Sequence, residues 1–216
     1  MTSGEKRILV RVNDMHRHMH TRIVSVLMGL ALLCGSVAAH AQAWGLPDLM
    51  HMLAKHKSAN ATFTEKKFIA LMDQPLESAG ELSYTAPDKL EKRTLMPKAE
   101  TMILDGDRLS MQRAGRRRMS VSLQSRPEAA AFVESVRGTM AGDLSALQKY
   151  YTLELAGRAE AWKLTLVPTQ PGMLKIMSRI RIEGTQDAIT LIIFDQADGD
   201  RSEMRIVAVS AQQSAP

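Results

Sequence analysis

Cysteine is almost absent from this chain of 216 residues, which contains only Cys34. Cys34 lies within residues 23–38, an uncharged segment that follows a basic N-terminal region. If these N-terminal residues are removed by a signal peptidase, the remaining protein has no thiol at all. That composition excludes disulfide bonds, thiol chemistry and cysteine-based zinc sites, even in an oxidising compartment.

A long hydrophobic run is also missing, because the uncharged segment has only sixteen residues. A helix that crosses a bilayer needs about 20 apolar residues, so this segment is too short. The basic region before it and the small residues of the alternative cleavage sites at 39–43 are typical of a cleavable signal peptide. We therefore predict a signal peptide over residues 1–41 and a single exported domain over residues 42–216.

In an alternative interpretation, Cys34 is acylated and anchors the protein to a membrane, which would make it a membrane-bound acceptor. Bacterial lipoproteins place a small residue before the modified cysteine, whereas Leu32 and Leu33 precede it here. Soluble export is therefore the favoured prediction.

Excess charge is absent from the predicted domain. Residues 1–41 carry five Lys or Arg and two Asp or Glu, which leaves 23 basic against 21 acidic residues and a net charge of +2. Nucleic-acid-binding domains usually carry a strong basic excess, so we expect no nucleic-acid partner.

Catalytic motifs are missing as well. Residues 42–216 contain no G-x-S-x-G, P-loop or H-E-x-x-H pattern. Their only histidines, His51 and His56, are five positions apart, whereas joint metal ligation from one helix favours a spacing of four. We predict no enzyme activity, no metal and no cofactor.

The pattern that is present is mainly that of strands. Residues 46–58 are predicted to form an amphipathic helix, because Leu49, Met52 and Leu53 share one face behind a proline in the first turn. From residue 60 the period changes to short strand-like runs, separated by turn residues about every 8–12 positions. That rhythm favours an antiparallel meander.

Turns and helices complete the predicted fold. Asp105-Gly106 and Asp198-Gly199 indicate tight hairpins, whose turns need the positive φ that glycine adopts easily. Helices over residues 126–140 and 142–150 interrupt the strands, and Gly138 is a candidate end for the first. About eleven strands result, and so long a sheet must curl. We predict an α+β, mainly antiparallel β fold, a curled half-barrel sheet with a helical lid over an apolar cavity.

Two further features each allow two interpretations. Arg116 to Arg118 form a basic spot, which is either a hydrated hairpin end or a contact for anionic lipid headgroups or an acidic partner. Methionine is frequent, with 15 residues. Its flexible side chain suits both an adaptable apolar pocket and ordinary core filling.

The order of motifs resembles that of the LolA-type periplasmic lipoprotein carriers, in a divergent LolA-like branch. The resemblance covers residues 46–210. It rests on ATFTEKK after the first helix, GELSYTAPDKLEKRT (80–94), PKAETMILDGDRL (97–109) and LVPTQPGMLKIMSRIRIEG (166–184). It implies an eleven-stranded half-barrel whose helices cover a cavity for acyl chains, in the periplasm of a Gram-negative bacterium.

The function that this resemblance implies is that of a soluble carrier. It would bind the acyl chains of a lipoprotein, or of another lipid-linked cargo, and shuttle it towards the outer membrane. An inner-membrane donor complex and an outer-membrane acceptor would be its partners, and we expect a monomer. Each buried methylene contributes about 0.8 kcal/mol, so a long chain offers about 10 kcal/mol in an apolar cavity. The alternative is a lipid- or lipoprotein-sensing module, or an accessory of envelope assembly, without transport.

The apolar face of the sheet and its lid are expected to line the acyl cavity. The candidates are Leu82, Tyr84, Leu90, Met102, Leu104, Leu109, Met111, Trp162, Leu164 and Leu166 on the sheet, with Phe132, Val136, Met140 and Leu144 on the lid. Ordinary core packing is the alternative for each, because pockets and cores share the same pattern.

The resemblance has one departure that concerns the lid. Better-known carriers have an arginine immediately before the proline of the segment that matches TAPD, and this arginine hydrogen-bonds the closed lid. This chain has Ala86 there. Its lid therefore lacks that hydrogen bond. The resemblance alone does not predict transport of lipoproteins in general, and this difference favours a specialised cargo.

Overall fold

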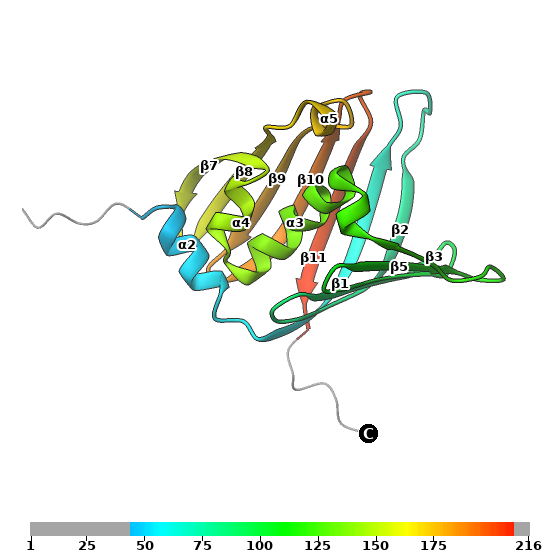
Figure 1. Cartoon of the computed structure of the whole chain (residues 1–216), viewed down its shortest axis with the longest axis horizontal. Helices are drawn as coiled ribbons and strands as arrows, with labels where there is room; N and C mark the ends of the chain where they lie inside the picture. The colour runs from blue at the N-terminus through cyan, green and yellow to red at the C-terminus, as the bar shows by residue number, and fades with distance from the viewer. Residues whose placement is uncertain (1–43, 210–216) are drawn as a thin grey trace, which may run out of the picture. The chain divides into compact units, whose positions relative to one another are not determined.

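The computed structural model describes residues 44–209, and the predicted signal peptide and Cys34 lie outside the described residues. Within this part of the chain, eleven strands form one antiparallel sheet in the order β6-β5-β4-β3-β2-β1-β11-β10-β9-β8-β7 (Figure 1). Strands that follow one another in the chain pair with each other, except that β6 and β7 lie at opposite edges of the sheet and the first strand pairs with the last. The strands are β1 (Ser58–Phe68), β2 (Leu76–Thr85), β3 (Lys89–Met96), β4 (Glu100–Asp105), β5 (Arg108–Arg113), β6 (Met119–Ser122), β7 (Tyr151–Arg158), β8 (Ala161–Pro168), β9 (Met177–Thr185), β10 (Ala188–Gln196) and β11 (Arg201–Ala208).

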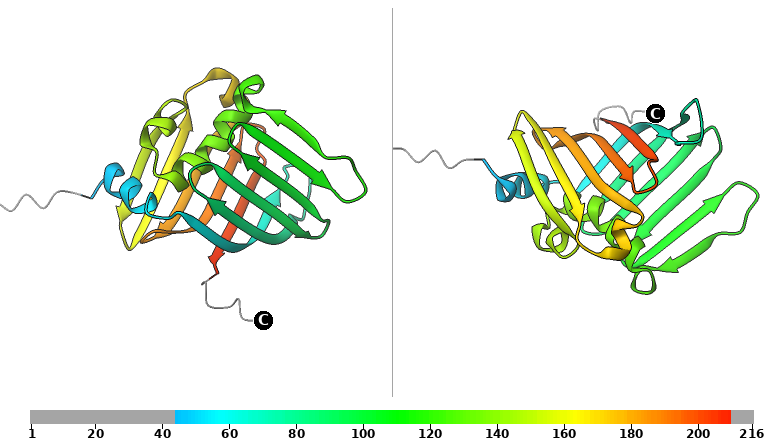
Figure 2. Two further views of the ribbon diagram at one scale, coloured as in Figure 1. Left: turned by 60° about the horizontal axis from the view of Figure 1, so that its bottom comes forward. Right: turned by 90° about the horizontal axis from the view of Figure 1, so that it is seen from above.

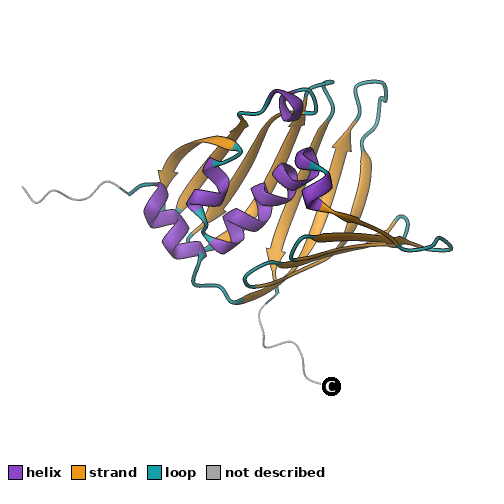
Figure 3. Ribbon diagram, in the orientation of Figure 1, coloured by secondary structure: helices purple, strands orange, loops and turns teal. Residues whose placement is uncertain are grey.

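The main helices lie on one face of this sheet (Figure 3). The sheet curls around them, so that its β3–β6 side is turned steeply against its β7–β10 side (Figure 2). The predicted fold class is confirmed. None of the helices within residues 44–209 combines the length and the apolar character needed to cross a membrane. The helices are α2 (Leu46–Leu53), α3 (Pro127–Ala141), α4 (Leu144–Gln148) and α5 (Pro171–Leu174).

Local sequence explains the strands and their turns. In β1, the inward-facing Ala61 and Phe63 flank the exposed Thr62, because successive side chains of a strand point to opposite faces. The predicted hairpin turns are confirmed, since Gly106 has a φ of 55° and Gly199 a φ of 93°. Glycine adopts this left-handed region without steric cost.

The first helix begins as predicted but is shorter. The Asp48 carboxylate accepts a hydrogen bond of 2.8 Å from the Gly45 backbone N–H, and Pro47 lies in the first turn. The helix ends at Leu53 rather than at residue 58, because β1 already begins at Ser58.

Gly138 does not end α3, contrary to the prediction. The helix continues to Ala141 and ends at Gly142, whose φ of 66° is the left-handed conformation common at helix C-termini. Gly138 instead lies where α3 meets α4, and a Cβ at this position would come within 3.0 Å of Leu147. Close helix packing, rather than helix termination, explains this glycine.

The helices divide the concave face of the sheet into two parts. Over β7–β9, α2 and α4 pack directly on the strands and form a solid core (Figure 1). Helix α3 extends over the strands on the other side, where side chains leave a cavity. The buried members of the core include Leu49, Leu53, Leu147, Tyr151, Trp162, Leu164, Leu166, Ile180 and Ile182.

Candidate functional site: a lidded apolar cavity

Between α3 and the inner face of the sheet lies a cavity of about 570 Å³. Its floor consists of side chains from β1–β5, β10 and β11, and α3 covers it with Phe132, Val133, Val136 and Met140. Ligand pockets usually measure about 300–1,000 Å³ and are lined mainly by apolar side chains. This cavity therefore has the size and the lining of a site for an apolar ligand.

The structure brings most of the predicted lining residues together. Cross-strand pairing aligns them, since Tyr84 is opposite Leu90, Leu90 is opposite Leu104, and Leu104 is opposite Leu109. One apolar row therefore crosses β2, β3, β4 and β5 at the same height. That these residues contact an acyl chain stays a prediction. The predicted residues that line the cavity are Leu82, Tyr84, Leu90, Met102, Leu104, Leu109, Phe132, Val136 and Met140.

The predicted residues of β8 and α4 lie elsewhere. Leu164 and Leu166 are fully buried in the core, and Leu144 of α4 packs against the same core. Trp162 covers Gly184 of the neighbouring strand, and its indole N–H donates to the Gln186 carbonyl at 2.8 Å. These side chains are not available to a ligand, because α2 and α4 fill the space above them.

Met111 is also outside the cavity lining. It lies on β5 between Met102, which lines the cavity, and Met119 of the edge strand β6. It therefore continues the inner face of the sheet beyond the cavity rather than forming its wall.

Sequence reasoning missed the contribution of the strands at the centre of the sheet. β1, β10 and β11 supply much of the floor, because β1 pairs with β11 across almost the whole chain. Alternation in β1 is a usable signal, but the near-continuous apolar run of β10 hides which side chains face inward. The missed apolar residues are Ala59, Ala61, Val133, Ile176, Met177, Ala188, Ile189, Ile192, Phe194, Met204, Ile206 and Ala208.

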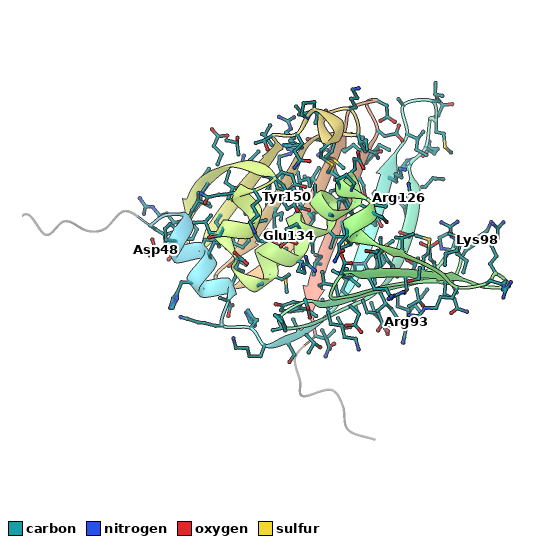
Figure 4. All side chains as sticks on the ribbon, in the orientation of Figure 1. Asp48, Arg93, Lys98, Arg126, Glu134 and Tyr150 are labelled. Carbon is teal, nitrogen blue, oxygen red and sulfur yellow. The ribbon has the colours of Figure 1, made fainter. Side chains whose placement is uncertain are left out.

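Arg137 fastens the lid helix to the sheet. Its Nη1 donates to the Gly106 carbonyl in the β4–β5 turn at 2.8 Å, and its Nε donates to the Glu134 carboxylate at 3.1 Å. Glu134 lies in the middle of α3 (Figure 4) and is almost completely buried. Because a buried charge is costly without a partner, Arg137 serves both as the counter-ion of Glu134 and as the link to the sheet.

A second set of contacts holds the first half of the lid. The Tyr151 hydroxyl donates to the Ala131 carbonyl at 2.7 Å, and burial raises the pKa of this hydroxyl, so it remains a donor. Phe132 packs against Phe194 of β10 with ring centroids 5.0 Å apart. Ala86 has no hydrogen-bonding side chain, and the described contacts of α3 are made instead with the β4–β5 turn, β7 and β10.

The cavity is not uniformly apolar, because Glu65 of β1 points into it. Its carboxylate accepts hydrogen bonds from Lys92 Nζ at 2.5 Å and from the Ser202 hydroxyl. Lys92 also lies over the Phe63 ring, 4.8 Å from its centroid. Burial alone would raise the pKa of Glu65, but the Lys92 ammonium and the hydroxyls of Ser202 and Ser78 outweigh it and lower this pKa. The cavity thus carries an internal ion pair at neutral pH.

The Glu65 pair predicts a pH dependence of stability. A carboxyl whose pKa is lowered by folding stabilises the protein above its unfolded pKa, near 4.5, and this contribution is lost as the pH falls through the folded value. We expect Glu65→Gln to lower the free energy of unfolding at pH 7 by about 1.5–3 kcal/mol and to flatten its decline below pH 5, as measured by urea unfolding. Glu77→Gln, which breaks an exposed pair with Lys66, is the control. An equally steep acid decline in Glu65→Gln would contradict the assignment.

Metal binding finds no support in the described part of the chain. Within residues 44–209, no three His, Asp or Glu side chains come together as metal ligands. His56 pairs with Asp187 at one end of the cavity, at 2.9 Å. The cavity therefore offers apolar burial, the Glu65–Lys92 ion pair and the contact of His56 with Asp187.

The family model described as "Outer membrane lipoprotein carrier protein LolA-like" matches residues 38–216. The chain belongs to this LolA-like family. Two curated relatives of the LolA-like protein are outer-membrane lipoprotein carrier proteins of Pseudomonas entomophila (strain L48) and Pseudomonas putida (strain KT2440). Each is 21% identical over 200 residues, which cover 90% of this chain and 91% of the relative.

Solved structures of low identity also align with the LolA-like protein. One is a LolA superfamily protein of Nitrosomonas europaea, with a TM-score of 0.44, 9% identity, and coverage of 76% of this chain and 92% of that chain. Another is a putative outer membrane lipoprotein-sorting protein domain of Vibrio parahaemolyticus, with a TM-score of 0.41, 9% identity, and coverage of 79% and 92%.

Proposed function

We propose that this protein is a soluble periplasmic carrier, which binds the acyl chains of a lipoprotein or of another lipid-linked cargo and shuttles it towards the outer membrane. The observation that carries the proposal is the apolar cavity of about 570 Å³ beneath α3. An acyl chain leaves a bilayer only where another apolar environment receives it, since each methylene exposed to water costs about 0.8 kcal/mol. Membership of the LolA-like family supports the same cargo class.

The arrangement of the lid suits loading and release. Above the cavity, helix α3 is linked to the sheet by a few polar contacts and one aromatic pair, and elsewhere it contributes Ala131 to the core and packs on α4 at Gly138. A lid that opens at a cost of a few kcal/mol can be opened by a partner that binds the open state better. We propose an inner-membrane donor and an outer-membrane acceptor as such partners, with a monomeric carrier between them.

The proposal includes the processing of the chain. Residues 1–41 would be a signal peptide and residues 42–216 the carrier domain, without any cysteine. Native mass spectrometry of the protein isolated gently from the periplasm tests this part. A mass that begins at Gln42 or Trp44 with one acylated adduct is expected, and a mass that begins at a lipidated Cys34 would overturn it.

The transport function is tested by measuring the transfer of an acylated ligand from the protein to a membrane. The purified protein is loaded with a fluorescent palmitoylated peptide and mixed with acceptor vesicles, and transfer is followed by energy transfer to a vesicle dye. A carrier is expected to deliver the peptide faster than spontaneous release into buffer. Tight binding of the peptide without its transfer to the vesicles, also in the presence of envelope extract, would overturn the proposed carrier function. That result would favour the sensing or accessory module.

A further inference from the structure

The free ends of two neighbouring hairpins form a distinct surface of the described domain. The β3–β4 turn and the β5–β6 turn lie side by side, since the Ala114 backbone N–H donates to the Ala99 carbonyl at 3.4 Å. Residues 95–99 and residues 114–119 are all exposed, and Glu100, which follows the first segment, is half-buried. Lys98 lies at the far end of this surface, away from the helices (Figure 4). We call residues 95–99 and 114–119 the hairpin tip.

The hairpin tip has a charge of one sign. It carries Lys98, Arg116, Arg117 and Arg118 and contains no Asp or Glu. Among the ion pairs of residues 44–209, none involves these four cations. The nearest carboxylate in the sequence, Glu100, is already paired with Arg113. A local charge of +4 is therefore uncompensated within the described structure, although the predicted domain as a whole is almost neutral.

Large apolar side chains are exposed among these cations. Met96 and Met119 are each 63% exposed, and Leu95 is 51% exposed. None of the three lines the cavity beneath α3. Basic residues interleaved with exposed flexible apolar side chains suit the interface of an anionic bilayer, where the cations meet phosphates and the apolar groups enter the headgroup boundary.

The hairpin tip is continuous with the cavity. Met119 is opposite Met111 and Met111 is opposite Met102, so one methionine from each of β6, β5 and β4 forms a row on the inner face of the sheet. Met102 lines the cavity, and Met119 directly follows Arg118 at the tip. Flexible thioether side chains provide an adaptable apolar track. A bilayer at the tip would therefore meet the outer end of a track that leads to the cavity.

We propose that the hairpin tip docks on the surface of an anionic phospholipid membrane. An acidic protein would match the charge alone, whereas the interface of an anionic bilayer also takes up the exposed Leu95, Met96 and Met119. This docking requires no acyl chain in the cavity, so it is independent of the proposed carrier function. Its failure and the failure of cargo hand-over are thus separate results.

Vesicle binding tests the proposal. The protein purified after expression of the full chain is sedimented with vesicles of phosphatidylcholine alone or of phosphatidylcholine mixed with phosphatidylglycerol. Each basic residue near an anionic surface contributes about a fivefold factor to binding, so R116Q/R117Q/R118Q is expected to weaken binding to the anionic vesicles about 100-fold. Raising NaCl from about 0.05 to about 0.5 M is expected to weaken wild-type binding strongly, because salt screens exposed charges.

Two further variants separate the tip from general charge. R158Q/K163Q/R205Q removes three exposed cations on β7, β8 and β11 and is expected to bind like the wild type. Met96→Ser with Met119→Ser keeps the charge and is expected to weaken binding severalfold. Equal losses in the two triple variants, unchanged binding of the tip variants, or equal binding to neutral vesicles would overturn the proposal. So would charge-dependent capture of an acidic protein by a tip that binds no vesicles.

Discussion

Ala61→Trp is expected to abolish binding of an acylated ligand while the domain remains folded. Ala61 lines the floor of the cavity, in register with Leu82 of β2 and Ala208 of β11. Its small side chain leaves the space beneath α3 open. An indole at this position would point into the cavity rather than into packed core, so the fold has room for it and the ligand does not.

The expected loss is large. An indole would displace roughly three or four methylenes of a bound chain, and at about 0.8 kcal/mol each this costs about 3 kcal/mol. That free energy corresponds to about a 100-fold rise in Kd. Fluorescence anisotropy of a labelled palmitoylated peptide measures it directly.

A matched control lies one residue further along β1. Thr62 is exposed on the outer face of the same strand, so Thr62→Trp adds the same ring without entering the cavity. This variant is expected to bind like the wild type. Equal affinity of Ala61→Trp and wild-type protein would show that acyl chains bind elsewhere. Thermal unfolding of both variants verifies that the sheet is intact.

Arg137→Gln is expected to loosen the lid and destabilise the domain. Arg137 is the described counter-ion of the buried Glu134 and the donor to the Gly106 carbonyl. Its loss leaves a buried carboxylate without a cation, which typically costs about 3–5 kcal/mol for a fully buried pair. Arg137 is partly exposed, so we expect about 2–3 kcal/mol and a fall in Tm of roughly 5–10 °C.

The double variant Glu134→Gln with Arg137→Met separates the charge from the link to the sheet. It removes the unpaired carboxylate, so most of the stability is expected to return, whereas the Gly106 link stays broken. Hydrogen exchange of the α3 amides is expected to be faster than wild type in both variants. If the single and the double variant are equally destabilised, the ion pair is not the cause.

Much of the fold follows from local patterns. Alternation in the strands, glycine at Gly106 and Gly199, and the proline start of α2 predict the elements, because each depends only on near neighbours in the chain. Strand order is almost as local, since nine of the ten pairings in the sheet join strands that follow one another in the chain. The exception is Gly138, whose role depends on a second helix.

The cavity depends on contacts that no local pattern contains. Pairing of β1 with β11 brings the Glu65 carboxylate to the Ser202 hydroxyl, 137 residues away in the chain. The same alternation of apolar residues occurs in β2, where it faces the cavity, and in β8, where Leu164 and Leu166 are solid core. What separates them is the position of α2 and α4, which fill one half of the concave face and leave the other half open beneath α3. The sequence by itself determined the strands, turns and apolar faces. Only the tertiary structure decided which apolar face is packed and which is hollow, because that depends on where the helices lie.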